Sequence, residues 1–161
     1  MAEVLILTTG GTIDKLYFDA LSTYQIGDSV VDRLLQTARV TLPYRRVELM
    51  RKDSLELTDD DRALIRERVA ACSETHVLIT HGTDTMTQTA ECLQDIAGKV
   101  IVLTGAMQPA RMRASDAPFN LGLALGALQC LPPGVYIAMN GQVFHAGQVR
   151  KNRHAGRFEA R

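Results

Sequence analysis

The sequence predicts an α/β fold: a single doubly wound domain of three layers, αβα, around a mostly parallel sheet (Rossmann-like or flavodoxin-like). Short apolar, β-branched runs alternate with longer helical patterns, and this alternation favours parallel strands with helices on both faces. A chain of 161 residues fits one domain. Neither a repeat nor a low-complexity linker interrupts the pattern, so one domain is expected over residues 1–161.

Two strands are expected in the first third of the chain, at 4–8 and at 44–50. The stretch 14–28 between them is polar and carries turn signals, so a loop is expected there. A helix is expected at about 29–38, because apolar residues recur there at i, i+3 and i+4 spacing. The next helix begins after Thr58, whose hydroxyl can cap the first backbone N–H groups.

The second half of the chain alternates in the same way and ends in a hairpin. Asn140-Gly141 is a strong signal for a tight hairpin turn, which predicts an antiparallel return at 142–145. Ligands of such sheets bind beyond the carboxyl ends of the strands, so the residues that follow each strand are candidates for the site. The other expected elements are strands at 77–80, 100–104 and 135–139, helices at 84–96 and 119–130, and a Pro/Arg-containing loop at 107–118.

Charge and hydropathy argue against several classes of partner. The 18 Lys and Arg residues balance the 18 Asp and Glu residues, which argues against a nucleic-acid binder that depends on a strong positive field. No apolar run reaches the roughly 18–20 residues that span a bilayer, so no membrane is expected. The N-terminus lacks the basic region and cleavage site of a secretory signal, which favours a cytoplasmic location.

The cysteines are Cys72, Cys92 and Cys130, widely spaced and each within a helical pattern. An odd count at such spacing favours buried thiols in a reducing compartment over a disulfide framework. Neither C-x-x-C nor H-E-x-x-H occurs, so no zinc site and no other metal is expected.

Two strand ends carry unusual residues. Thr8–Ile13 reads Thr-Thr-Gly-Gly-Thr-Ile, and Thr80–Thr85 reads Thr-His-Gly-Thr-Asp-Thr and opens a helix. Glycines let backbone N–H groups approach a ligand, and a threonine hydroxyl beside such donors is placed like a nucleophile beside an oxyanion hole. The alternatives are a tight turn with a helix cap, or a phosphate-cradling loop. The sequence contains no G-x-G-x-x-G, Walker or G-x-S-x-G motif.

A threonine hydroxyl is a weak nucleophile and needs a positioned base. From the residues alone the candidates are Asp84, His81 and a lysine brought in by the fold. A lysine serves as a base at pH 7 only where burial or neighbouring cations favour its neutral form. Lys151, between Arg150 and Arg153, is such a candidate, although composition alone favours a solvated basic tail.

Taken together, these turns resemble the signatures of the bacterial-type L-asparaginases, the asparaginase/glutaminase family. Thr9–Ile13 is similar to the first signature of the family and Thr80–Met86 to the second. Both together, in this order and at this spacing, are highly specific. The likeness continues through Gly105–Met107 and Ser115–Leu121 and covers roughly residues 4–153.

The resemblance implies catalytic roles for five residues. Thr12 matches the primary nucleophile of the family, and Tyr24 matches a loop tyrosine that hydrogen-bonds to it. Thr83, Asp84 and Lys151 match a second triad, in which the lysine is linked to the threonine hydroxyl and the aspartate contacts the substrate amine. This match places Lys151 in the site and not in a solvated tail.

The resemblance also implies a set of substrate-binding residues. Backbone N–H groups of the glycine turns would stabilise the oxyanion, a serine would bind the α-carboxylate of the substrate, and an alanine carbonyl would lie near its amide. These residues are Gly11, Asp53, Ser54, Gly82 and Ala106. His81 is interpreted as structural.

The function that the resemblance implies is an L-asparagine amidohydrolase, which works through a threonine nucleophile and an acyl-enzyme without a cofactor. Glutaminase activity is a secondary expectation. The alternatives are a non-catalytic amino-acid-binding module and the amidase subunit of a tRNA-dependent amidotransferase.

Typical family members are longer and carry a second, smaller α/β domain. The sequence therefore resembles a short form with the N-terminal domain only, the usual C-terminal domain being absent. A homodimer or homotetramer is expected to cover the surface that this leaves exposed.

Overall fold

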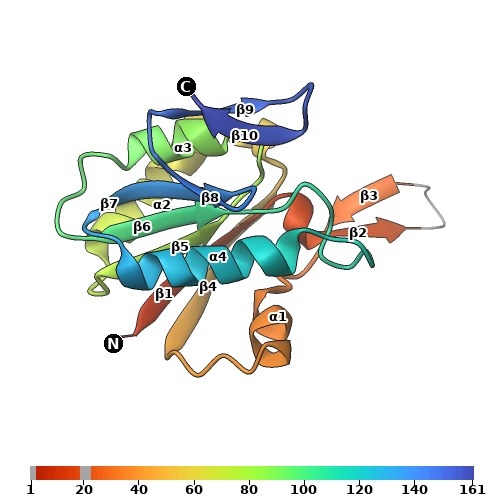
Figure 1. The fold of residues 1–161 in the computed structure, drawn as a ribbon, viewed down its shortest axis with the longest axis horizontal. Helices are drawn as coiled ribbons and strands as arrows, with labels where there is room; N and C mark the ends of the chain where they lie inside the picture. Colours follow the sequence, from red (N-terminus) through yellow and green to blue (C-terminus); the bar gives the residue numbers. More distant parts are fainter. Residues whose placement is uncertain (1–2, 19–22) are drawn as a thin grey trace.

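A six-stranded sheet forms the centre of the computed structural model, which describes residues 3–18 and 23–161 (Figure 1). Its strands lie in the order β4-β1-β5-β6-β7-β8, and every neighbouring pair is parallel except β7 and β8. The predicted α/β fold with a mostly parallel sheet is confirmed. The strands are β1 (Val4–Gly10), β4 (Tyr44–Lys52), β5 (His76–Thr80), β6 (Val100–Thr104), β7 (Gly134–Met139) and β8 (Gln142–His145).

Helices cover both faces of the sheet, because successive apolar residues of a strand point to opposite sides. Leu5 and Leu7 of β1 pack with α2 and α3, whereas Val4 and Ile6 pack with α1 and α4. In Figure 1, α4 crosses in front of the sheet. The core therefore has two apolar layers, as the three-layer prediction requires. The helices are α1 (Val31–Thr37), α2 (Asp59–Ala71), α3 (Met86–Cys92) and α4 (Ala117–Cys130).

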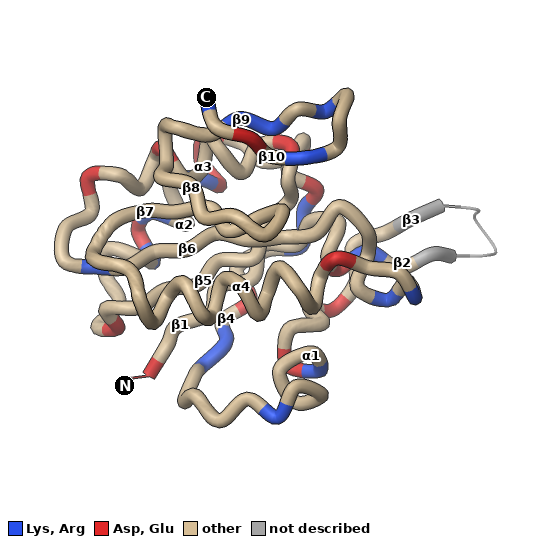
Figure 2. Tube along the Cα trace, in the orientation of Figure 1, with Lys and Arg blue, Asp and Glu red and all other residues tan. Residues whose placement is uncertain are grey.

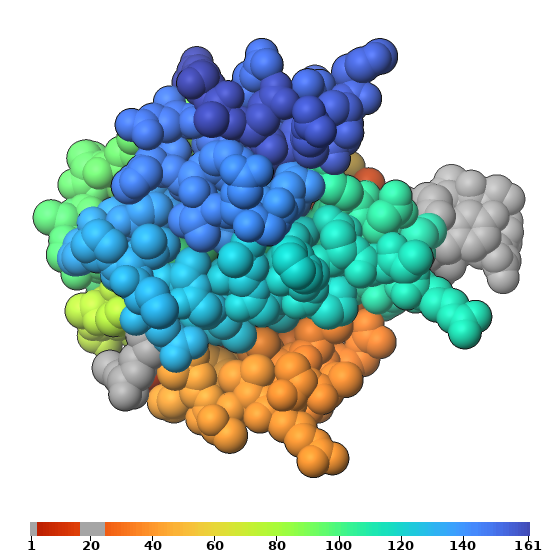
Figure 3. Space-filling view, viewed as in Figure 1, coloured from red at the N-terminus to blue at the C-terminus, as the bar shows by residue number. Residues whose placement is uncertain are grey.

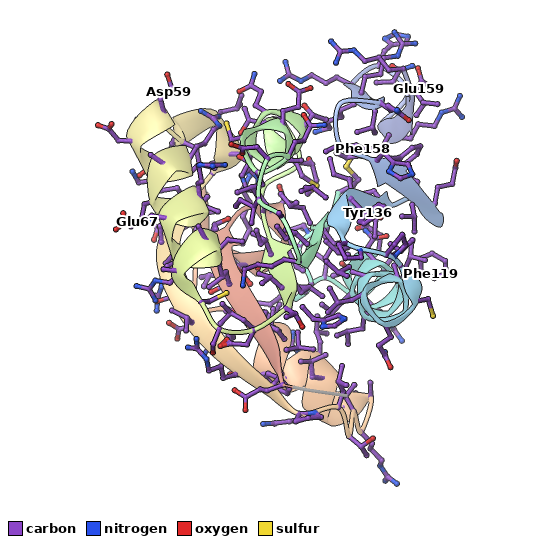
Figure 4. The ribbon with its side chains drawn as sticks, turned by 90° about the vertical axis from the view of Figure 1, so that its left-hand side faces the viewer. Asp59, Glu67, Phe119, Tyr136, Phe158 and Glu159 are labelled. Atoms are coloured by element: carbon purple, nitrogen blue, oxygen red, sulfur yellow. The ribbon has the colours of Figure 1, made fainter. Side chains whose placement is uncertain are left out.

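The start of α2 follows the sequence prediction. Thr58 Oγ1 accepts a hydrogen bond from Asp61 N at 3.2 Å, and the Asp61 carboxylate accepts one from Thr58 N at 2.9 Å. This capping box satisfies backbone donors that the helix leaves free. Past the cap, α2 turns Asp59 and Glu67 outward, away from the sheet (Figure 4).

The hairpin expected at Asn140-Gly141 is confirmed. Asn140 has φ of 56° and Gly141 has φ of 72°, so both central residues adopt the left-handed conformation that tight hairpin turns favour. Met139 pairs with Gln142 in an antiparallel register. This turn brings the chain back along the edge of the sheet.

The stretch 14–28, expected as a loop, contains a short antiparallel hairpin. Its strands are β2 (Lys15–Phe18) and β3 (Thr23–Ile26), with Lys15 paired to Ile26. Each strand has 4 residues, too few for an alternating pattern to stand out in a polar stretch. Figure 1 shows the hairpin projecting from the end of the sheet where β1 finishes.

The C-terminal residues form a second hairpin, although composition favoured a solvated tail there. Its strands are β9 (Val149–Asn152) and β10 (Arg157–Ala160). Val149 and Phe158 are buried in the core cluster that also contains residues of α3, and Figure 4 shows Phe158 pointing inward. These two apolar side chains hold the charged hairpin against the domain, on the face shown in Figure 3.

The expectation of buried thiols is wrong for two of the three cysteines. Cys92 and Cys130 are exposed and Cys72 is half-buried, all three as free thiols. Cys92 and Cys130 are the last residues of α3 and α4, where a helix leaves the sheet and its end meets solvent.

Positive and negative side chains are interspersed along the chain (Figure 2). Within the described residues, no helix is long and apolar enough to cross a membrane. In that same part of the chain, no cluster of three or more His, Cys, Asp or Glu side chains is arranged to hold a metal ion.

Candidate active site

Two glycine turns meet where β1 and β5 end. Gly11 has φ of 86° and ψ of −178°, a backbone region essentially restricted to glycine. A Cβ on Gly11 would lie 2.4 Å from Gly82 N, and one on Gly82 would lie 2.5 Å from Ser54 Cβ. The structure therefore brings three predicted site residues into direct contact, with no space for a side chain at either glycine.

Ser54 is hydrogen-bonded to the turn that follows β5. Its side chain is fully buried, and its Oγ accepts hydrogen bonds from Asp84 N at 3.1 Å and Thr85 N at 3.3 Å. Thr85 Oγ1 donates to Ser54 O at 2.8 Å in return. Ser54 thus fixes the backbone that carries Thr83 and Asp84, and its contact with a substrate carboxylate stays a prediction.

Thr83, Asp84 and Lys151 form one hydrogen-bonded cluster. Lys151 Nζ donates to Thr83 Oγ1 at 2.7 Å and to Asp84 Oδ1 at 2.7 Å. The Lys151 side chain is only 14% exposed, so the solvated-tail interpretation is wrong for this residue. It reaches the site because the hairpin β9–β10 is held in place by its buried side chains, and Phe158 is the residue paired with Lys151.

Asp84 contacts a second cation, Arg153, to which no role in the site was expected from the sequence. Arg153 Nε lies 3.3 Å from the same Asp84 Oδ1 that Lys151 contacts. Burial raises the pKa of Asp84, but the hydrogen bond and charge of Lys151 and the charge of Arg153 outweigh it, so this pKa lies below its ordinary value. Asp84 is therefore an anion at neutral pH.

Thr12 begins the 3-10 turn η1 (Thr12–Asp14) directly after Gly11, and it is half-buried. Together with Lys15 and Met107 it lines a shallow cleft of about 270 Å³. Thr12 is thus accessible from outside, as a nucleophile must be.

Ala106 follows β6 and is fully buried against Ile13. Asp116 holds the loop behind it, because its carboxylate accepts hydrogen bonds from Met107 N at 2.9 Å and Gln108 N at 3.0 Å. From the sequence, Asp116 is known only as part of the stretch Ser115–Leu121 that carries the resemblance. Its position just before a helix whose second residue is proline was the available signal for a structural carboxylate.

The structure describes the side-chain contacts of Asp53 but not the side chain of Tyr24. Asp53 Oδ1 accepts a hydrogen bond from Leu55 N at 3.3 Å, and Asp53 Oδ2 lies 3.3 Å from Lys15 Nζ. Asp53 therefore joins the turn η3 (Ser54–Glu56) to the first hairpin, and its contact with substrate stays a prediction. The side chain of Tyr24 lies outside the described part of the chain, so its predicted bond to Thr12 stays a prediction.

His81 is fully buried and faces local groups. Its Nδ1 lies 2.6 Å from Gly82 O and its Nε2 lies 2.8 Å from Thr89 Oγ1. The carbonyl can only accept, so Nδ1 carries the proton and donates, and Nε2 accepts from the Thr89 hydroxyl. Burial lowers the pKa of His81 to about 4. A neutral imidazole with both nitrogens engaged supports the structural interpretation.

Asp14, which the sequence analysis did not single out, closes the base of the first hairpin. It is buried, its Oδ1 accepts a hydrogen bond from Val30 N at 3.0 Å, and its backbone carbonyl accepts one from Arg111 at 2.8 Å. Burial raises the pKa of Asp14 from 3.8 to about 6, against the opposing effects of the Val30 N–H and the Arg111 charge.

This raised pKa predicts an effect on stability. The folded protein binds the Asp14 proton more tightly than the unfolded chain does, so stability falls as the pH rises from about 4 to about 6. Asp14→Asn keeps an acceptor for Val30 N without the buried charge. It is expected to raise the free energy of unfolding at pH 7 by about 2 kcal/mol and to flatten its pH dependence in that window.

Urea unfolding at several pH values measures this effect. Glu67→Gln, which removes an exposed carboxylate from the outer side of α2, is the control. Equal stability of the two variants at pH 7 would contradict the assignment of a costly buried charge to Asp14.

The fold and the site define the class of this protein: an α/β domain in which a threonine hydroxyl, a lysine and an aspartate meet beyond the carboxyl ends of parallel strands. The family model described as Asparaginase, N-terminal matches residues 3–160. The chain belongs to the asparaginase family.

Individual relatives agree with this assignment. The chain is 31% identical over 163 residues to a probable periplasmic L-asparaginase of Haemophilus influenzae, covering 94% of this chain and 46% of the relative. It is 31% identical over 167 residues to a glutaminase-asparaginase of Acinetobacter glutaminasificans, covering 92% of this chain and 49% of the relative. The chain thus spans about half the length of the curated relatives it matches.

A solved structure has the same fold. A probable cytoplasmic L-asparaginase of Campylobacter jejuni superimposes with a TM-score of 0.80 at 28% identity, covering 99% of this chain and 52% of the other. Because the similarity extends over almost all of this chain, it includes both glycine turns and the second hairpin.

Proposed function

We propose that this protein hydrolyses the side-chain amide of L-asparagine to give L-aspartate and ammonia. The observation that carries the proposal is the contact of Lys151 Nζ with both Thr83 Oγ1 and Asp84 Oδ1, at 2.7 Å each. Sequence neighbours alone would not produce this cluster, since Thr83 and Asp84 follow β5 whereas Lys151 lies on β9. Membership in the asparaginase family and the names of its relatives support the same activity.

The proposed reaction passes through an acyl-enzyme. Thr12 Oγ1 attacks the amide carbon, its proton leaves with the departing ammonia, and backbone N–H groups of the glycine turns stabilise the oxyanion. The Gly11 N–H is not one of these donors, because it already donates to Lys52 O at 2.9 Å. A water molecule then attacks the ester carbon, the bond to Thr12 Oγ1 breaks, and Thr83 and Lys151 assist the transfer of the water proton to Thr12 Oγ1 as L-aspartate is released. Asp84, an anion at neutral pH, is suited to accept the substrate ammonium.

Glutamine differs from asparagine by one methylene, which is worth about 1–3 kcal/mol in a pocket. A relative named glutaminase-asparaginase supports including glutaminase activity in the proposal, as a secondary reaction. We also propose a cytoplasmic homo-oligomer. The name of the Campylobacter jejuni neighbour supports that compartment, whereas that of the Haemophilus influenzae relative is periplasmic.

Ammonia release from the purified protein tests the proposal, with L-asparagine and L-glutamine as parallel substrates. Release from L-asparagine is expected to exceed release from L-glutamine, and Thr83→Ala is expected to lose both. A folded protein that binds L-aspartate but releases no ammonia would be the amino-acid-binding module instead. The melting temperature of each protein shows that loss of activity is not loss of folding.

A further inference from the structure

Asp84 is shared by two cations. Lys151 Nζ lies 2.7 Å from Asp84 Oδ1, and Arg153 Nε lies 3.3 Å from the same oxygen. The Arg153 guanidinium also donates to the backbone carbonyl of Asp84 at 3.5 Å. Three polar contacts therefore converge on one residue, and two of them bring positive charge to the carboxylate proposed to bind the substrate ammonium.

The backbone turn that carries Arg153 is itself fixed. Arg153 directly follows β9, and Asn152 Oδ1 accepts a hydrogen bond from Ala155 N at 3.0 Å across this turn. Asn152 is half-buried, whereas the Arg153 side chain is 63% exposed. Because the backbone is fixed and the side chain is exposed, the Arg153 guanidinium is accessible to a substrate that enters the site from solvent.

Arg153 and Asp84 both line a cleft of about 700 Å³ between α3 and the second hairpin. In the lining of this cleft, Arg161 pairs with Glu91 and Arg150 pairs with Glu159, so the charges of these pairs balance. At Asp84, one carboxylate faces two cations, which leaves an excess of one positive charge beside Thr83. Figure 2 shows the basic residues along β9 and in the turn that follows.

This excess charge has a consequence for substrate choice. A substrate ammonium at Asp84 would sit beside Arg153, and like charges at such a distance repel. A substrate that has the same amide and carboxylate but no ammonium escapes this repulsion, and its carboxylate is attracted by the same guanidinium.

We propose that Arg153 is a specificity-determining residue, which shifts the site from free amino acids toward monoamides of dicarboxylic acids that carry no α-ammonium. The proposal rests on the amide hydrolysis proposed above and names its substrate class. Because Arg153 is partly exposed, its effect is that of a solvent-screened charge, about fivefold in relative kcat/KM.

The test compares L-asparagine with succinamic acid, which has hydrogen in place of the α-amino group. Arg153→Gln is expected to raise kcat/KM for L-asparagine relative to succinamic acid by about fivefold. Arg153→Lys keeps the charge and is expected to retain a ratio close to that of the wild type. Arg33→Gln, which removes an exposed arginine of α1, is the matched control and should leave the ratio unchanged.

A ratio that is the same in Arg153→Gln and the wild type, or one that falls, would overturn the proposal. Position 153 is exposed, so the Arg153→Gln variant is expected to fold, and its melting temperature checks this. If it does not fold, the Arg153→Lys and wild-type ratios are compared in low and high salt. If the ratio of the kcat/KM values for the two substrates is the same in low and high salt, the proposal is overturned.

A failure of the proposed hydrolysis gives a different result. If the wild type releases ammonia from neither compound, the hydrolysis proposal fails, and calorimetric binding of L-aspartate and succinate replaces the kinetics. Arg153→Gln must then bind L-aspartate more tightly relative to succinate than the wild type does. An unchanged ratio, or no binding of either compound by either protein, overturns the role of Arg153.

Discussion

Lys151→Met is expected to lower kcat for asparagine hydrolysis by about a thousandfold, the size typical for loss of a positioned proton-transfer group. Lys151 Nζ is the donor to both Thr83 Oγ1 and Asp84 Oδ1, and methionine has a similar length without the charge. KM should change less than kcat, since Lys151 contacts the Thr83 hydroxyl, which assists proton transfer in the proposed reaction. Ammonia release under saturating and limiting L-asparagine separates the two constants.

The matched control is Arg157→Met, which removes a cation from the partner strand of the same hairpin. The Arg157 side chain is 64% exposed and pairs with Glu159, so activity should stay close to that of the wild type. Similar losses in the two variants would mean that the hairpin acts through its overall charge and that Lys151 has no particular role.

A double-mutant cycle sharpens this prediction. Thr83→Val removes the hydroxyl that Lys151 contacts and keeps the shape of the side chain. If the two groups act as a unit, the double variant should be little slower than either single variant. Losses that multiply would show that Thr83 and Lys151 contribute to separate steps.

The glycine and threonine turns could be found from sequence because their signal is local. Each of Thr9–Ile13 and Thr80–Met86 lies within a few residues of a strand end, and the rule that ligands bind beyond the carboxyl ends of parallel strands places both turns at the site. The structure then brings Gly11 into contact with Gly82. When two such motifs follow strands that are neighbours in the sheet, the order of the strands is enough to predict that the motifs meet.

Lys151 could not be placed by such reasoning. It lies 68 residues from Thr83 in the sequence, in a stretch whose composition indicates a solvated tail. Its position depends on the burial of Val149 and Phe158, two apolar residues among many charged ones. The residues alone named Lys151 as one candidate base, and only the family resemblance placed it in the site, because a resemblance compares positions along the chain.

Arg153 and Asp14 show a second kind of interaction that could not be predicted from the sequence. Both act through charges that meet across the fold: Arg153 at Asp84 and Asp14 near Arg111. Burial of a carboxylate such as Asp14 has no sequence signature, because its cause is the packing of segments far apart in the chain. Resemblance alone also assigned no role to Arg153, so its contact with Asp84 became visible only in the structure.

Gly11→Ala is expected to destabilise the protein by about 4 kcal/mol or more and to abolish activity. The substitution combines two costs. Gly11 has φ of 86° and ψ of −178°, where a side chain is strained, and its Cβ would lie 2.4 Å from the backbone nitrogen of Gly82. Backbone atoms cannot move aside as the end of a flexible side chain can, so the two glycine turns must separate.

Gly98→Ala gives the cost of a side chain at positive φ where no close contact is made. Gly98 has φ of 76°, and a Cβ there would meet nothing within 4 Å. The expected loss is about 1 kcal/mol, from backbone strain alone. Urea unfolding of both variants gives the difference, which includes the cost of the close contact between the two turns. Equal destabilisation would mean that the turns can separate freely, and the proposed oxyanion site would then lack the rigidity that catalysis needs.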